Sequence, residues 1–398
     1  MLSPRLLITI DNLLNPLYRL ALLLFISFRK KHVNRGMGDQ PVYAIKMMGI
    51  GSITRIYRTL KEKGADFDKV LFISLHSNRA LFEALAVRNV KYINGKNLFV
   101  LMLDLVRLFF FIRRTKPASL VNYERASNFL GLFQILTVSF SRTVLSSFHD
   151  LDEDYSNEND RIYSLQNRPF QELIQLTLDN YSLLIRPPRQ ESSDVSIDAK
   201  KIIININASD YMPYRRYGQD QFADVIRQLH RQNPSLYFEL IGSGQEKGYV
   251  QALIDEVDDE EIRLINRCGS WSIVNLMEEF RDCALFITGD SGPMHIAALI
   301  NIPMITIWGP TSANHFGYNN DLVVNIETTE GCSPCFQYAK SRAARSCNKR
   351  IDCLTRLRSS RIVAAAQAIL DRSETSRTVA VSSGEMGLQP DTKHSFVS

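Results

Sequence analysis

The residues best suited to chemistry in this chain lie in the run Asp290 to His295, Asp-Ser-Gly-Pro-Met-His. The run separates an apolar segment, Ala284 to Thr288, from a helical pattern, Ile296 to Ile300. Glycine lets the backbone approach a ligand closely, and proline suits the first position of a helix. The free N–H groups at a helix start carry the positive end of its dipole and favour a bound phosphate. The run therefore predicts a phosphate-binding site.

A second strand end follows soon after the first. Pro303 to Trp308 is apolar and ends in Gly309-Pro310-Thr311, a turn of small and hydroxyl residues. Ligands of open parallel sheets bind outside the carboxyl ends of the strands. We therefore expect both turns to border one crevice.

These segments resemble glycosyltransferase family 9, the bacterial heptosyltransferases of lipopolysaccharide core assembly. The resemblance rests on residues 289–295, Ala297-Ala298 and Gly309-Pro310-Thr311, and extends loosely over residues 41 to 370. It implies an α/β GT-B fold with two Rossmann-like lobes facing a central cleft, an ADP-heptose-type donor in the C-terminal lobe and an acceptor in the N-terminal lobe. It also implies inversion at the anomeric carbon and no cofactor or metal for catalysis. Taken alone, the hexapeptide also fits an ordinary strand-to-helix turn.

The resemblance assigns donor-binding roles to further residues of the second half. Arg215 and Arg216 match the family's phosphate-binding loop, where a guanidinium can hold two phosphate oxygens, and Arg215 is the first choice. Glu246 lies where the family places a carboxylate against the donor ribose. Adjacent arginines, a glycine turn and a single histidine also occur for structural reasons alone. The expected donor-binding residues are Ser209, Arg215, Arg216, Glu246, Asp290, Ser291, Gly292, His295 and Thr311.

The first half departs from the family pattern at the expected catalytic base. In typical relatives the glycine turn after the first strand carries an aspartate, whereas this chain has Gly49-Ile50-Gly51 followed by Ser52. Serine does not accept a proton unaided at neutral pH. We consider Glu124 as the base, or alternatively as a surface carboxylate beside Arg125. Gly49 and Gly51 are expected to contact the acceptor.

Ser52 leaves three classes of function open. The main prediction is an inverting glycosyltransferase that moves a heptose-like or other sugar from a nucleoside diphosphate to a lipopolysaccharide-core, lipid-linked or other cell-envelope acceptor. A non-catalytic sugar-nucleotide-binding or scaffold protein would explain the missing aspartate directly. A nucleotide-sugar epimerase could use the same two lobes and would need no membrane-facing segment.

Length and charge limit the number of domains and the kind of partner. A chain of 398 residues, 45% hydrophobic and 22% charged, can form two globular domains with tails. Its net charge of +5 is compatible with phosphates or an acidic lipid surface. The charge lacks the dense basic stripe of a nucleic-acid binder, so no nucleic-acid partner is expected.

Alternating strand and helix patterns predict parallel sheets covered on both faces. The expected domains are an N-terminal lobe over 41–190 and a C-terminal lobe over 200–355, joined by a Pro-rich linker near Pro187 to Asp194. Residues 356–372 are expected to form a helix that can cross back to the first lobe. Residues 373–398 are expected to form a disordered tail.

Two apolar segments raise the question of membrane contact. In the extension over residues 1–40, Leu17 to Phe28 precedes a basic cluster, but Arg19 interrupts it. A spanning helix needs roughly 20 apolar residues. We expect this extension to lie on the inner face of the bacterial inner membrane, so that the protein is cytoplasmic and peripheral. Packing on the protein itself and an uncleaved signal anchor are alternatives. Leu98 to Ile112 predicts a buried crossover helix, with a second membrane-touching surface as the alternative.

Four of the six cysteines gather near the C-terminus, at Cys332, Cys335, Cys347 and Cys353. In a reducing cytoplasm, thiolates at such spacing can hold a structural zinc ion. The spacing after the first pair is irregular, so reduced thiols or a disulfide-forming loop are the alternatives.

Overall fold

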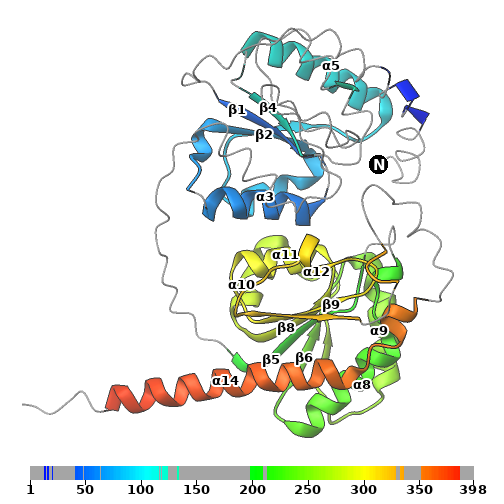
Figure 1. Cartoon of the computed structure of the whole chain (residues 1–398), viewed down its shortest axis with the longest axis vertical. Helices are drawn as coiled ribbons and strands as arrows, with labels where there is room; N and C mark the ends of the chain where they lie inside the picture. The colour runs from blue at the N-terminus through cyan, green and yellow to red at the C-terminus, as the bar shows by residue number, and fades with distance from the viewer. Residues whose placement is uncertain are drawn as a thin grey trace, which may run out of the picture.

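The computed structural model describes residues 41–47, 49–62, 64–115, 119–123, 198–208, 213–328, 332–335 and 351–385, with residue 117 and short pieces of 13–20 and 132–133. These residues form an N-terminal lobe (41–123) and a C-terminal lobe (198–385), one above the other in Figure 1. The predicted linker, most of the N-terminal extension and residues 386–398 lie outside the described residues.

A parallel sheet forms the centre of the N-terminal lobe, with strand order β3-β2-β1-β4. Its strands are β1 (Val42–Ile45), β2 (Val70–Leu75), β3 (Val90–Ile93) and β4 (Ser119–Asn122). Its helices are α3 (Ile50–Glu62), α4 (Arg79–Ala84) and α5 (Leu98–Thr115), with short 3-10 turns η1 (Phe67–Lys69) and η2 (His76–Asn78).

Helices cover both faces of this sheet, as the sequence pattern predicts. Ile53 and Ile56 of α3 pack with Phe72 on one face. Leu108 of α5 packs with Ile73 on the other. Successive strand residues point to opposite faces, so neighbouring residues of β2 belong to two different cores.

The sheet of the C-terminal lobe is also parallel, with strand order β10-β9-β8-β5-β6-β7 in the described part of the chain. Its strands are β5 (Asp198–Asn205), β6 (Tyr237–Leu240), β7 (Leu264–Asn266), β8 (Cys283–Gly289), β9 (Met304–Trp308) and β10 (Val323–Glu327). The chain leaves β5 first to one side and then to the other. The order therefore reverses between β5 and β8, which is where open α/β sheets bind ligands.

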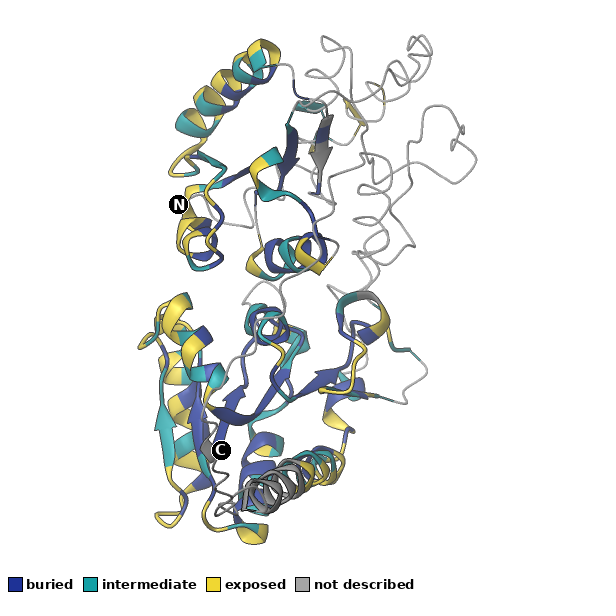
Figure 2. Ribbon diagram, turned by 90° about the vertical axis from the view of Figure 1, so that its left-hand side faces the viewer, coloured by how far each residue is buried: buried dark blue, intermediate teal, exposed yellow. Residues whose placement is uncertain are grey.

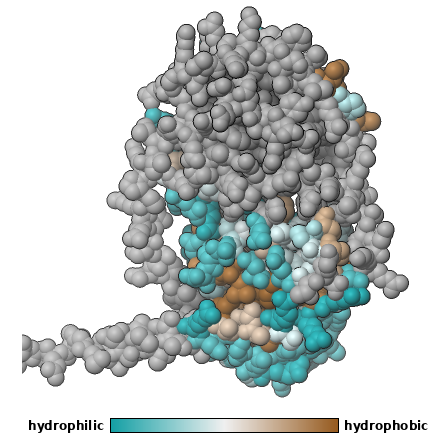
Figure 3. Space-filling model, viewed as in Figure 1, coloured by the Kyte–Doolittle hydropathy of each residue, from teal (hydrophilic) through white to brown (hydrophobic). Residues whose placement is uncertain are grey.

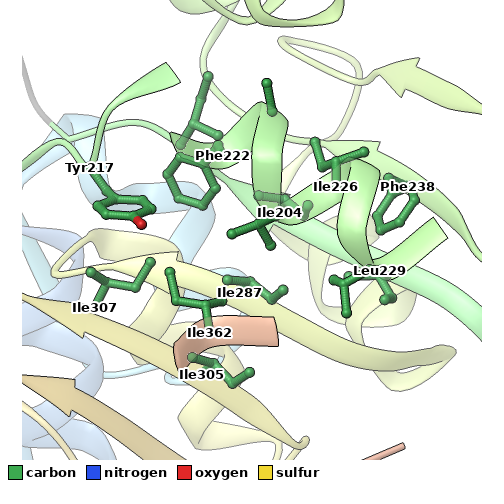
Figure 4. Packing of buried hydrophobic residues seen from close by; sticks show 14 of the residues in the cluster. Ile204, Tyr217, Phe222, Ile226, Leu229, Phe238, Ile287, Ile305, Ile307 and Ile362 are labelled. Carbon is green, nitrogen blue, oxygen red and sulfur yellow. The ribbon is translucent and has the colours of Figure 1, made fainter. Parts of the chain in front are cut away.

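Two layers of helices enclose this second sheet. They are η4 (Pro213–Arg215), α8 (Gln219–Gln232), η5 (Gly244–Glu246), α9 (Lys247–Val257), α10 (Ile273–Arg281), α11 (Gly292–Leu299), α12 (Ala313–Phe316), α13 (Asp352–Thr355) and α14 (Ser359–Glu385). Ile204 and Ile287 of the sheet meet Phe222 of α8 and Ile362 of α14 in the core shown in Figure 4. Helices α10 and α11 cover the opposite face. On the side seen in Figure 3, hydrophilic residues surround a hydrophobic centre of this lobe.

Helix α14 differs from the prediction in length and position. It continues to Glu385, so residues 373–385 belong to this helix and not to a disordered tail. Ile362, Val363 and Ala366 are buried against the C-terminal lobe. The second half of α14 then extends away from the lobe (Figure 1). Within the described chain it does not cross back to the N-terminal lobe, because its apolar residues match the core of its own lobe.

Candidate functional site

The ends of β5 and β8 are joined where the strand order reverses. The Asn205 side-chain amide donates to Thr288 Oγ1 (3.1 Å) and to Ser291 Oγ (3.0 Å). Asn207, two residues on, donates to the carbonyl of Ile241 (3.0 Å) and so links β5 to the end of β6. These amides fix the three strand ends that border the crevice.

Helix α11 begins directly at this junction. Ser291 is its N-cap, with extended backbone angles, and Pro293 lies in its first turn. The Ser291 hydroxyl is 2.9 Å from that of Thr288 and does not cap the helix. The N–H groups of the first turn are therefore not taken up by the N-cap side chain, which suits them to an anion.

Arg215 and Asp290 form an ion pair beside this helix start. Arg215 Nη1 lies 2.9 Å from Asp290 Oδ2, and both side chains are largely buried. Burial opposes ionisation of Asp290, but the charge of Arg215 and its hydrogen bond outweigh it and hold the pKa of this carboxyl below its ordinary value. The carboxylate thus holds the guanidinium at the crevice.

Three buried polar atoms around the crevice have no hydrogen-bond partner in the described part of the chain. They are Asn207 Oδ1, Arg215 Nε and Thr311 Oγ1. The Thr311 hydroxyl lies beside the Asp290 carboxylate. Buried polar groups are rarely left unpaired, and each exception calls for an explanation. A polar ligand that binds at the strand ends would supply these partners.

His295 is a neutral imidazole in this site. Burial, together with the charges of Arg55 and Arg215, lowers its pKa to about 3, although Asp290 opposes the shift. Its Nδ1 lies 2.8 Å from the hydroxyl of Tyr318. In this state His295 can exchange neutral hydrogen bonds with its neighbours.

The backbone of the N-terminal lobe at Gly49 to Gly51 contacts the imidazole of His295. Gly49 has φ +89°, and a Cβ added at Gly51 would lie 2.2 Å from Cδ2 and 2.8 Å from Nε2 of the imidazole. Glycine is therefore needed at position 51. The predicted acceptor-contacting glycines and the predicted donor-contacting histidine are brought together in one place, and Ser52 follows in the first turn of α3.

Helix α3 is held against α11 by Arg58. Its guanidinium donates to the carbonyl of Ala298 and to Asn301 Oδ1 (3.3 Å), and its Cζ lies 4.9 Å from the ring centre of Tyr318. Figure 1 shows α3 facing α10 and α11 across the gap between the ribbons. The two lobes are therefore closed against each other on this side of the site.

Glu246 and Arg216 are engaged by their own lobe. Glu246 Oε2 accepts from the backbone N–H of Ser243 (2.7 Å). Arg216 donates to the carbonyl of Ala208 (2.8 and 3.2 Å), and its Cζ lies 4.8 Å from the ring centre of Tyr249. Of the two predicted arginines, Arg215 is thus the one paired at the crevice.

Two predicted site residues, Ser209 and Glu124, lie outside the described residues. The expected site residues did not include Asn205, Asn207 or Arg55. The two asparagines had a signal in the sequence, because they lie at the end of the apolar run that forms β5. Arg55 had none, since its effect on His295 arises only when α3 packs on the other lobe.

The cysteine cluster is incomplete in the described chain because Cys347 lies outside it. Among the described residues no three His, Cys, Asp or Glu side chains are grouped as metal ligands. The structural zinc site stays a prediction.

Because His295 is neutral in the folded protein, the free energy of unfolding should decrease at low pH. The unfolded chain binds a proton at this histidine near pH 6.5, but the folded chain does so only near pH 3. Stability is therefore complete above pH 6.5 and decreases as the pH falls towards 3, at up to about 1.4 kcal/mol per pH unit. We expect urea unfolding of the wild type to lose about 2 kcal/mol more than His295→Gln between pH 6.5 and 5. An equal decrease in the free energy of unfolding of the wild type and of His295→Gln would contradict this prediction.

Two Rossmann-like lobes closed over a crevice at the strand-order reversal define a protein of the GT-B fold. A family 9 glycosyl transferase from Veillonella parvula superposes with a TM-score of 0.61 at 14% identity, over 85% of this chain and 99% of that one. The ADP-heptose lps heptosyltransferase II of E. coli gives 0.57 at 16% identity, over 84% and 99%. At such identities the likeness concerns the fold alone.

The family follows from the sequence match. The profile of glycosyltransferase family 9 (heptosyltransferase) matches residues 140–344, just over half of the chain, and the chain belongs to this family. Lipooligosaccharide heptosyltransferase 2 of Campylobacter jejuni is 29% identical over 143 residues, which are 35% of this chain and 44% of that protein. Its Haemophilus influenzae counterpart is 27% identical over 143 residues, which are 35% of this chain and 40% of that protein. The chain thus matches less than half the length of these relatives.

Proposed function

We propose that this protein is a glycosyltransferase that moves a sugar from a nucleoside diphosphate to a cell-envelope acceptor. The observation that carries the proposal is the anion site at the reversal of strand order. There Arg215, held by buried Asp290, stands beside the uncapped start of α11. A leaving diphosphate needs such preorganised positive groups, because negative charge develops on it as the donor bond breaks.

The proposed donor is an ADP-heptose-type sugar and the proposed acceptor a lipopolysaccharide or lipooligosaccharide core. The relatives support this choice, since they are heptosyltransferases and the name of one includes ADP-heptose. Inversion at the anomeric carbon and catalysis without metal are part of the same proposal. We place the enzyme at the cytoplasmic face of the inner membrane, where a lipid-linked acceptor is accessible.

Asp290 and His295 are poor general bases. Asp290 is ion-paired and its pKa lies below the ordinary value, while the pKa of His295 is lowered to about 3. A base is most effective when its pKa lies near the working pH. The proton of the acceptor hydroxyl must therefore pass to another group, for which Glu124 is our candidate. Gly49 remains a proposed acceptor contact, whereas the space beside Gly51 is occupied by His295.

A panel of ADP-, UDP- and GDP-sugars tests the function. The purified protein is incubated with each donor and with core oligosaccharide from a heptose-deficient strain, while donor binding and transfer are measured separately. We expect binding and transfer with an ADP-linked heptose. Tight binding without transfer to any envelope acceptor would favour the scaffold protein that Ser52 suggests. Conversion of the donor without an acceptor would indicate an epimerase, and no binding at all would defeat the proposal.

Glu124→Gln tests the proposed base. The change keeps the size of the side chain and removes its ability to accept a proton, so transfer should fall by about 100-fold or more while donor affinity stays the same. Ser52→Ala provides the control, since serine is not expected to serve as a base. Unchanged transfer by Glu124→Gln would remove this residue from the mechanism.

A further inference from the structure

Helix α5 exposes a continuous apolar face on the outside of the N-terminal lobe. Leu105, Leu108 and Ile112 of this helix are buried against the sheet. On the other side, Phe99 is 78% exposed and Phe110 61% exposed. Figure 2 shows this exposed side along the uppermost helix. The exposed large apolar residues are Leu98, Phe99, Met102, Leu103, Val106 and Phe110.

These six residues form one stripe. With about 100° of rotation per residue, they fall within an arc of roughly 140° that is separate from the buried arc. The stripe spans more than three helical turns, so its length approaches about 20 Å. Scattered exposed apolar residues are normal, but a contiguous patch of this kind marks an interaction surface. The expected buried crossover helix is thus buried on one side only.

Positive charge accompanies the stripe. Between Lys91 and Pro117 the sequence has six lysines and arginines and one acidic residue, Asp104. Asp104 is already paired with Arg107 (3.0 Å). Arg113 and Arg114, both exposed, follow the apolar stripe at the end of the helix. A helix with an apolar face and basic flanks suits the interface of an anionic bilayer.

We infer that the exposed face of α5 docks the N-terminal lobe on an anionic lipid surface. The helix lies in the interface and does not cross it: no helix in the described ranges is long and apolar enough to span a membrane. The charge balance favours lipid headgroups over a second copy of the chain, since two α5 faces would bring like charges together. Leu13, Leu17 and Leu20 of the N-terminal extension are also exposed, so these three side chains do not cover the stripe.

The inference extends the proposed function by naming the surface that would bring the enzyme to a lipid-linked acceptor. Vesicle binding needs neither donor nor acceptor, so the two proposals can fail separately. Transfer to a water-soluble core oligosaccharide should be the same in wild type and α5 variants. Loss of vesicle binding with unchanged transfer would thus concern the docking surface alone.

Sedimentation of the full chain with vesicles tests the docking surface. The vesicles contain either 30% phosphatidylglycerol in phosphatidylcholine or phosphatidylcholine alone. We expect the wild type to bind the anionic vesicles at least about tenfold more tightly. Phe99→Glu combined with Phe110→Glu should weaken that binding at least about tenfold, since it removes apolar contact and adds repulsion. Val274→Glu combined with Leu322→Glu, at exposed apolar positions of the other lobe, should bind as the wild type does.

A charge variant tests the basic flank without altering the apolar face. Arg113→Gln combined with Arg114→Gln should weaken binding to the anionic vesicles by about fivefold per charge and leave binding to neutral vesicles unchanged. Both residues are exposed, so folding should be retained, which thermal unfolding checks.

Three outcomes would overturn the inference. In the first, the double phenylalanine variant binds anionic vesicles as tightly as the wild type. In the second, Leu17→Glu combined with Leu20→Glu abolishes binding while the α5 variants have no effect, which assigns the membrane contact to the extension alone. In the third, the wild type does not bind vesicles but forms a dimer that Phe99→Glu and Phe110→Glu dissociate, which makes the face an interface between copies.

Discussion

Arg215→Ala should weaken binding of a nucleoside diphosphate by about 10- to 100-fold, which corresponds to the loss of hydrogen bonds between charged groups worth about 1.5–3 kcal/mol. Arg215 is the arginine that Asp290 holds at the crevice, and its Nε is buried without a partner in the described chain. Calorimetric titration with ADP and with the sugar nucleotide measures the effect. Arg215→Lys should recover part of the affinity, because it keeps the charge but loses the planar fork.

The same substitution should also destabilise the protein by about 3 kcal/mol, since it leaves the buried carboxylate of Asp290 without its partner. Adding Asp290→Asn to Arg215→Ala should restore most of the stability but none of the affinity. Arg231→Ala, a change at an exposed arginine of α8, controls for general effects of removing a charge. If Arg215→Ala binds ADP like the wild type, the diphosphate does not occupy this crevice.

Gly51→Ala should reduce sugar transfer by about 100-fold while donor affinity changes less than twofold. The added Cβ would lie 2.2 Å from Cδ2 of His295, and that ring cannot easily move because it is buried and bonded to Tyr318. The lobes would then be held apart by about 1 Å, and misplacement of this size costs about 100-fold in rate. Donor binding depends on the C-terminal lobe and should be retained.

Gly248→Ala is the matched control for this experiment. Gly248 lies in α9, and a Cβ added there meets nothing within 4 Å. Because alanine favours a helix over glycine by about 1 kcal/mol, this variant should be slightly more stable and fully active. Transfer by Gly51→Ala at the wild-type rate would mean that the contact between Gly51 and His295 is not needed for the reaction.

The strand and helix pattern could be predicted from the sequence because each central strand is a continuous apolar run. The apolar segment Ala284 to Thr288 is observed within β8 (Cys283–Gly289), and Pro303 to Trp308 is observed as Met304–Trp308. β10 (Val323–Glu327) was missed, since this strand at the edge of the sheet is only partly buried and contains Asn325 and Glu327. In α5, residues on all sides are apolar, so the sequence did not indicate which side the core would cover.

The candidate site was predicted where one local segment contained it and missed where distant segments meet. The run Asp290 to His295 indicated a helix start, and the structure has α11 begin at Gly292. The partners within the site are far apart in the chain: Arg215 pairs with Asp290, and Gly51 lies on His295. No pattern within a single segment of the sequence indicates that these distant residues meet. Their contacts depend on the reversal of strand order and on the packing of α3 against α11.

The contact of Gly51 with His295 has a consequence for the rate of the proposed reaction. The backbone of one lobe lies on the imidazole of the other, so a diphosphate would leave on this side only if α3 lifts from α11, provided that it binds behind that ring. Each turnover then includes a mechanical step of opening, and such steps often limit the rate of enzymes that close over their substrates. Release of the nucleoside diphosphate, and not cleavage of the donor bond, would then limit the rate of turnover.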